Sequence, residues 1–97
     1  MKVVNKRTHI PTANDVYIGR PTVFGNPWNM QYEKERQTVV RCYDDWIRND
    51  PGFVAERARQ AIYNLPAGAN LVCWCAPKPC HGDVILTLWN EHHKIRM

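Results

Sequence analysis

The stretch "NLVCWCAPKPCHGDVILTLWNEHH", residues 70–93, decides the fold predicted for this chain. It begins with a compact apolar run, passes through a proline-rich turn and ends in a helical pattern that places Val84, Ile85 and Leu88 on one face. A strand that leads through a turn into a helix is a typical unit of an α/β fold. Ligands of such folds bind where the carboxyl end of a strand meets the next helix, and the cysteines lie at that junction.

The apolar patterns of the preceding segments predict two strands followed by two helices. The predicted strands cover residues 1–7 and 16–20, and the predicted helices cover residues 32–49 and 53–65. The expected order of elements is therefore β-β-α-α-β-α. We predict a small single-domain α/β sandwich over residues 1–97, with a short, mostly parallel sheet and about three helices.

The composition is typical of a cytoplasmic protein. A chain of 97 residues that is 44% hydrophobic can bury a core without help from metal ions or disulfides. Its apolar runs are too short to span a membrane, and the first residues lack a stretch of signal-peptide length. We therefore expect no membrane partner, a cytoplasmic location and four reduced cysteines.

The formal net charge of +4 is unevenly distributed along the chain. Six of the nine acids, but only four of the thirteen basic residues, lie between Glu33 and Glu56. The flanking segments, which include the cysteine stretch, are therefore strongly basic. A basic surface suits a nucleotide, a phosphate group or a nucleic acid, and it also serves simply to keep a small protein soluble.

The cysteine stretch contains four candidate zinc ligands in the pattern C-x-C-x4-C-H. They are Cys73, Cys75, Cys80 and His81. The usual spacing of zinc ligands is C-x2-C, and the adjacent side chains of Cys80 and His81 diverge, so we expect no cofactor and keep zinc as the less favoured alternative. The competing interpretation makes Cys73 a core residue of a covered strand and leaves Cys75 open between a core residue and a ligand-binding residue.

Cys80, His81 and Asp83 follow two prolines at the predicted start of the last helix. A helix start presents free N–H groups and a partial positive charge, which lower the pKa of a cysteine and attract phosphate. These three residues are the candidate catalytic groups, with Cys80 as a nucleophile, Asp83 as a general base and His81 holding charge. Asp83 equally suits a helix cap, and His81 equally suits a contact within the turn.

The segment "GRPTVFGNPWNM", residues 19–30, is a long loop between the second strand and the first helix. Arg20 is a natural clamp for an anion, because its guanidinium is always charged and binds in a bidentate manner. Gly25 and Asn26 would bring the backbone close to a ligand, and Trp28 would stack on a base or a sugar. A surface ion pair for Arg20 and core packing for Trp28 are the alternatives.

Two motifs together resemble a known family. "VYIGRPTVFGNPW", residues 16–28, and "LVCWCAPKPCHGDVIL", residues 71–86, are similar to the small bacterial and phage family known as domain of unknown function 4326. The resemblance spans nearly the whole chain and implies a phage origin, and hence a location in the host cytoplasm. It implies no reaction, because the family name supplies none.

The predicted site joins the Arg20–Trp28 loop to the Cys75–Asp83 junction. Its expected ligand is nucleotide-like or phosphate-bearing, or the end of a nucleic acid, with Cys80 and Asp83 as the groups that would act on it. Whether the protein is an enzyme stays open at this point. One alternative is a non-catalytic protein that sequesters a host nucleotide signal or blocks a host protein, and another is a zinc-stabilised interaction module.

Overall fold

The secondary structure follows the predicted order. A computed structural model describes residues 1–94. Its elements are β1 (Lys2–Asn5), β2 (Asp15–Tyr17), the 3-10 helix η1 (Glu33–Glu35), α1 (Arg36–Asn49), α2 (Phe53–Tyr63), β3 (Asn70–Cys73) and α3 (His81–Lys94). The α/β class, the order β-β-α-α-β-α and the three main helices are thereby confirmed.

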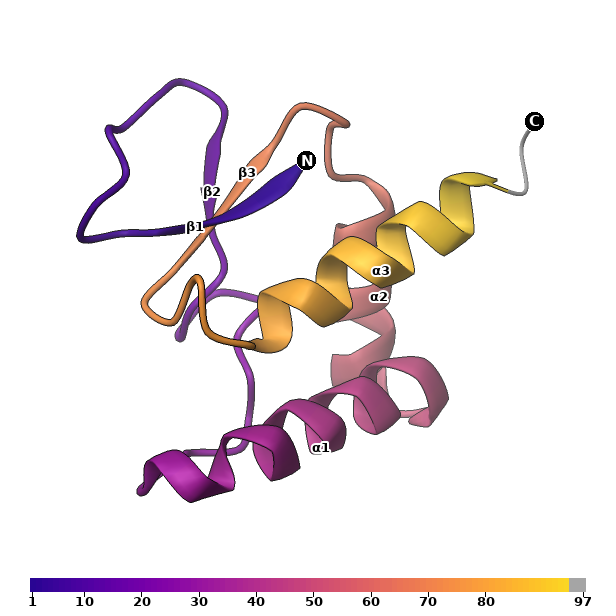
Figure 1. The fold of residues 1–97 in the computed structure, drawn as a ribbon. Coiled ribbons are helices and arrows are strands. Elements are labelled where there is room, and N and C mark those ends of the chain that lie inside the picture. The colour runs from indigo at the N-terminus through magenta and orange to yellow at the C-terminus, as the bar shows by residue number, and fades with distance from the viewer. Residues whose placement is uncertain (95–97) are drawn as a thin grey trace.

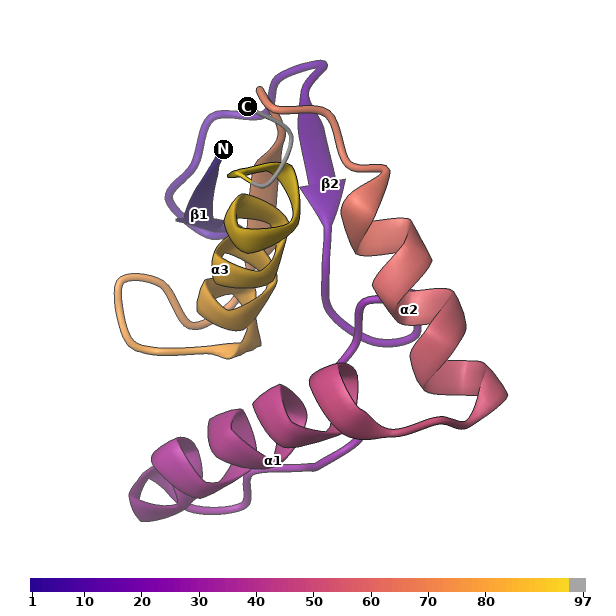
Figure 2. The same cartoon turned by 90° about the vertical axis from the view of Figure 1, so that its right-hand side faces the viewer.

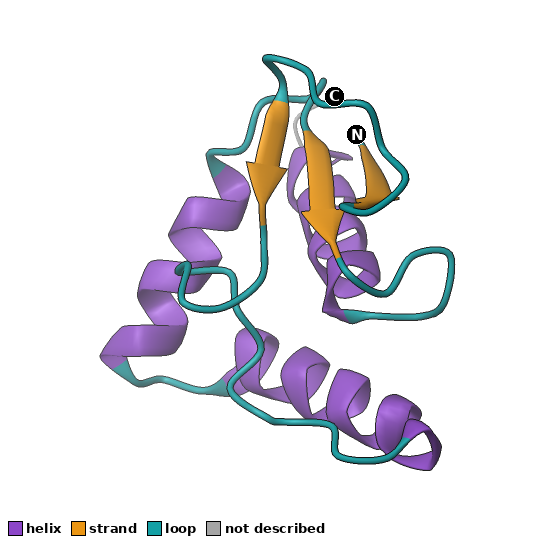
Figure 3. Ribbon diagram, turned by 90° about the vertical axis from the view of Figure 1, so that its left-hand side faces the viewer, coloured by secondary structure: helices purple, strands orange, loops and turns teal. Residues whose placement is uncertain are grey.

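The three strands form one parallel sheet with β3 between β1 and β2. Val3 of β1 and Val16 of β2 both lie opposite Leu71 of β3. Parallel neighbours need a long crossover connection, and α1 and α2 provide it between β2 and β3. All three strands therefore end at the same edge of the sheet, and α1 lies beyond that edge (Figure 1; Figure 3).

Helices α2 and α3 lie on one side of the sheet and give the molecule two layers, while α1 lies beyond the carboxyl edge (Figure 2; Figure 3). Helix α3 packs on β1 and β3, while α1, α2 and α3 all contact one another. The largest fully buried side chains come from both layers: Ile18, Tyr43, Ile47, Ile62, Leu71 and Ile85. Of the helices within residues 1–94, none is long and apolar enough to cross a membrane.

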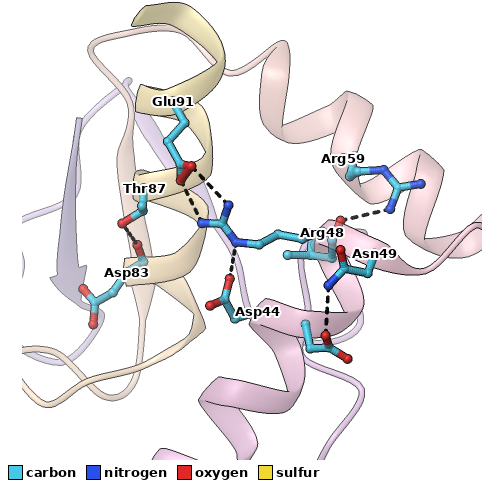
Figure 4. A network of polar contacts seen from close by, with 9 residues as sticks. Asp44, Arg48, Asn49, Arg59, Asp83, Thr87 and Glu91 are labelled. Carbon is cyan, nitrogen blue, oxygen red and sulfur yellow. Dashed lines mark hydrogen bonds and ion pairs between the residues drawn. The ribbon is translucent and has the colours of Figure 1, made fainter.

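Two arginines tie the helices together at their polar ends. Arg48 of α1 bonds to Asp44 on its own helix and donates to Glu91 of α3 at 3.2 and 2.8 Å (Figure 4). Arg59 of α2 donates to the carbonyl of Ile47 at 2.9 Å, which satisfies a backbone acceptor in the last turn of α1. These contacts fix α1 relative to α3, and both helices contribute to the cleft described below.

The structure differs from the sequence prediction at the strand ends. The second strand ends at Tyr17 rather than at residue 20, and the third, predicted from the apolar run at residues 70–76, ends at Cys73. The peptide bonds before Pro21 and Pro77 are both cis. Because both strands end early, Gly19 and Arg20 after β2 and Trp74 and Cys75 after β3 line a cleft at this edge.

The sequence pattern predicts an apolar stripe on the second helix made of Phe53, Val54, Ala58, Ile62 and Leu65, and this prediction is only partly correct. Phe53 and Val54 are 74% and 67% exposed, and α2 instead buries Ala55, Ala58 and Ile62. Phe53 and Val54 lie in the first turn of α2, and the buried side chains follow at helical spacing from Ala55 onward.

Candidate functional site

A cleft of about 370 Å³ lies at the carboxyl ends of β2 and β3. Its walls come from the segment after β2, the loop before α1, the first turns of α1 and the junction between β3 and α3. Six of the eight predicted site residues line it: Arg20, Asn26, Trp28, Cys75, Cys80 and His81. Gly25 and Asp83 do not line it. The structure thus brings the two sequence motifs together around one cavity.

Arg20 supplies an exposed positive charge to this cleft. Of the ion pairs formed within residues 1–94, none uses Arg20. Gly25 contributes indirectly, because a Cβ atom at this position would lie 2.8 Å from Cγ of Arg20. The glycine therefore leaves room for the stem of the Arg20 side chain, and we assign it a positioning role.

Asn26 holds the loop before α1 in place. Its Nδ2 donates to the carbonyl of Val39 at 3.1 Å, and its Oδ1 accepts the backbone N–H of Trp28 at 2.9 Å. Trp28 packs edge-to-face on Trp46 at 6.2 Å and remains 39% exposed. The loop therefore presents part of the Trp28 ring to the cleft from a fixed position.

Two thiols meet at the buried end of the cleft. Sγ of Cys73 lies 3.5 Å from Sγ of Cys80, and the side chains belong to residues that are 2% and 3% exposed. The hydrogen bond between the two thiols lowers the pKa of Cys73, helped by the backbone N–H groups of Cys75 and Ala76. The same bond raises the pKa of Cys80, and burial adds to that effect.

Within this pair the pKa is lowered at Cys73 and raised at Cys80, the residue that the sequence analysis offers as the candidate nucleophile. Cys80 does lie at the start of α3, where the N–H of Gly82 donates to its sulfur at 3.3 Å. That single donor is outweighed, because the hydrogen bond with Cys73 and burial both raise the pKa of Cys80. The position of Cys80 at the start of a helix could not predict its contact with the sulfur of Cys73.

Asp83 and His81 differ in how they relate to the cleft. Asp83 accepts the backbone N–H of Cys80 at 3.1 Å, so its carboxylate caps the start of α3. His81 donates from Nε2 to the carbonyl of Ile18 at 2.8 Å and packs edge-to-face on Tyr43 at 5.1 Å. Burial lowers the pKa of His81, so the neutral ring keeps Nδ1 as an acceptor.

This buried imidazole gives a pH-dependent stability. The folded-state pKa of His81 lies below its ordinary value of 6.5, so the unfolded chain takes up a proton at a higher pH than the folded chain does. We expect the urea midpoint to fall between about pH 7.5 and about pH 5.5, and to fall less steeply in His81→Gln. Equal slopes for the two proteins would show that another group controls this range.

Arg36 lines the cleft, although no motif in the sequence identified it as a site residue. Its Nη1 donates to the carbonyl of Pro79 at 2.9 Å, while Nε and Nη2 bond to Glu33 at 2.8 and 2.9 Å. Glu33, and then the thiol of Cys75, raise the pKa of Arg36. Since Arg36 and Pro79 are 43 positions apart, only the folded chain shows that this arginine braces the cleft wall.

The sequence analysis also missed a basic and aromatic surface beside the cleft. It consists of Lys6, Arg7, Tyr17 and Trp74, and we call it the basic ledge. Trp74 is 50% exposed and donates from Nε1 to the hydroxyl of Tyr17 at 2.9 Å. The ammonium of Lys6 and the guanidinium of Arg7 lie 5.9 and 5.7 Å from the Trp74 ring. Because Tyr17 and Trp74 line the cleft, the ledge extends it with aromatic rings and positive charge.

The four candidate zinc ligands do not converge. Among residues 1–94, no group of three or more His, Cys, Asp or Glu side chains is arranged to hold a metal ion. Cys73 and Cys80 are in contact, but Cys75 lies against Arg36 and His81 turns Nε2 toward the carbonyl of Ile18.

The fold and the cleft describe a small α/β protein with a cleft at the carboxyl edge of a parallel sheet. The family model for domain of unknown function 4326 matches residues 2–91, so the chain belongs to this family. The uncharacterized 12.4 kDa protein in the nrdA-td intergenic region of Enterobacteria phage T4 is 31% identical over 93 residues, covering 96% of this chain and 81% of that protein. The chain is thus a phage-type protein, and no solved structure is significantly similar to it.

Proposed function

We propose that the cleft binds a nucleotide-like or phosphate-bearing ligand, such as a free nucleotide or the end of a nucleic acid. The observation that supports this proposal is the convergence of Arg20 with the partly exposed rings of Trp28 and Trp74. Guanidinium groups bind phosphate in a bidentate manner, and indole rings stack on bases. The carboxyl edge of a parallel sheet is also where α/β proteins usually bind ligands.

Different residues of the cleft would contact different parts of the ligand. Arg20 would bind the phosphate, because its guanidinium makes no ion pair within residues 1–94. The Trp28 and Trp74 rings would hold the base or sugar, and the neutral Nδ1 of His81 can accept a hydrogen bond from it. Arg36 braces the wall through Pro79 and leaves fewer donors for a ligand.

Binding without turnover is the version that we favour. The candidate nucleophile from the sequence, Cys80, has a raised pKa because of its hydrogen bond with Cys73 and its burial. The carboxylate of Asp83 is engaged as a helix cap, outside the cleft. A catalytic version would instead use the Cys73 thiolate as the nucleophile, because its pKa is the one that is lowered.

Calorimetric titration with AMP, ADP, ATP and inorganic phosphate tests the proposal. We expect saturable binding of at least one nucleotide, with weaker binding of phosphate alone because phosphate offers nothing to stack on the tryptophans. Absence of saturation with every nucleotide and with oligonucleotides would contradict the proposal. Chromatography of the ligand after incubation then separates the two versions, since a binding protein returns the ligand unaltered.

A further inference from the structure

The paired thiols at the end of the cleft are placed for chemistry that ligand binding does not require. Cys73 is the last residue of β3, and Cys80 immediately precedes the first residue of α3. Their sulfur atoms are 3.5 Å apart, which is a contact distance, and both residues line the cleft although they are almost fully buried. A small molecule in the cleft can therefore reach a dithiol that bulk solvent hardly touches.

We propose that Cys73 and Cys80 form a peroxide-reactive dithiol that closes reversibly to a disulfide. A disulfide bond is about 2.05 Å long, so the two sulfur atoms, now 3.5 Å apart, need to approach each other by only about 1.5 Å. The lowered pKa of Cys73 supplies the thiolate that such a reaction needs. The inference is independent of the proposed ligand, because it rests on the sulfur pair alone.

The reaction proceeds in two balanced steps with hydrogen peroxide as the oxidant. The Cys73 thiolate attacks one peroxide oxygen, the O–O bond breaks, and the products are a sulfenic acid and hydroxide. The Cys80 thiol loses its proton and attacks the sulfur of Cys73, forming the S–S bond and releasing the second hydroxide. The two hydroxides take up the two thiol protons, so two thiols and one peroxide give one disulfide and two water molecules, and a dithiol reductant reverses the change.

The other two cysteines provide matched internal controls. Cys42 is half-buried on α1 and lies outside the cleft. Cys75 is also half-buried and lines the cleft, where it lies against Arg36. A double variant, Cys42→Ser with Cys75→Ser, leaves only the proposed pair and does not disturb the two buried thiols. It therefore keeps the test valid even if substitutions at Cys73 or Cys80 prevent folding.

Intact-mass spectrometry after treatment of the reduced protein with peroxide tests this proposal. The wild type and the double variant should each lose about 2 Da, the two thiol hydrogens, and dithiothreitol should restore the original mass. Peptide mapping should join residue 73 to residue 80, and Cys73→Ser or Cys80→Ser should abolish the loss. Gains of about 16 or 32 Da without a disulfide in the double variant, no reaction at all, or a disulfide that includes Cys75 would overturn it.

Discussion

Arg20→Ala should weaken nucleotide binding by roughly ten- to a hundredfold, because a charge-assisted hydrogen bond contributes about 1.5–3 kcal/mol. Arg20 is exposed, lines the cleft and forms no ion pair within residues 1–94. Removal of the Arg20 side chain should therefore change the stability of the folded protein little, while the ligand loses its main contact to phosphate. Calorimetric titration of wild type and variant with the same nucleotide measures the effect.

Two companion variants make this result specific. Arg57→Ala removes an arginine from α2, whose guanidinium lies 5.6 Å from the ring of Phe53 and outside the cleft. It should bind nucleotide as the wild type does. Arg20→Lys keeps the charge but loses the planar fork, so its affinity should lie between those of wild type and Arg20→Ala. If Arg20→Ala and Arg57→Ala bind equally well, Arg20 does not hold the phosphate.

Ile62→Ala should lower the free energy of unfolding by about 2–5 kcal/mol, a large share of the roughly 5–15 kcal/mol of a typical domain. Ile62 is completely buried on α2 in the core cluster that contains Ile47, Leu71 and Ile85. Truncation leaves a cavity that the surrounding side chains from both layers can only partly fill. Urea denaturation followed by circular dichroism measures the loss.

Ile10→Ala is the matched control, because it removes the same atoms from a side chain that is 82% exposed. Its free energy of unfolding should stay within about 0.5 kcal/mol of the wild-type value. Equal losses in Ile10→Ala and Ile62→Ala would be incompatible with a core built around α2.

The order of elements could be predicted because each segment carries a local pattern. The apolar run at residues 70–73 and the spacing of Val84, Ile85 and Leu88 identify a strand and a helix without reference to the rest of the chain. The location of the site also followed from local features, since both motifs lie just after strands. Parallel strands then bring their carboxyl ends to one edge.

The details of the site depend on contacts between distant positions, which a local pattern does not contain. Arg36 reaches Pro79 across 43 positions, and the indole of Trp74 reaches Tyr17 across 57. The assignment of the lowered pKa to Cys73 instead of Cys80 depends on one sulfur–sulfur contact. Phe53 and Val54 were likewise predicted to lie in the core because they are hydrophobic, but the folded chain leaves both of them exposed.

The most direct test of the proposed site is an NMR titration that follows the four tryptophan indole N–H signals during addition of a nucleotide. We expect saturable shifts of the Trp28 and Trp74 signals, because both residues line the cleft. The signal of Trp89, whose Nε1 donates to the carbonyl of Leu65 at 2.8 Å away from the cleft, should stay in place. Saturable shifts confined to Trp46 and Trp89, with Trp28 and Trp74 unchanged, would show that the nucleotide does not bind in the cleft.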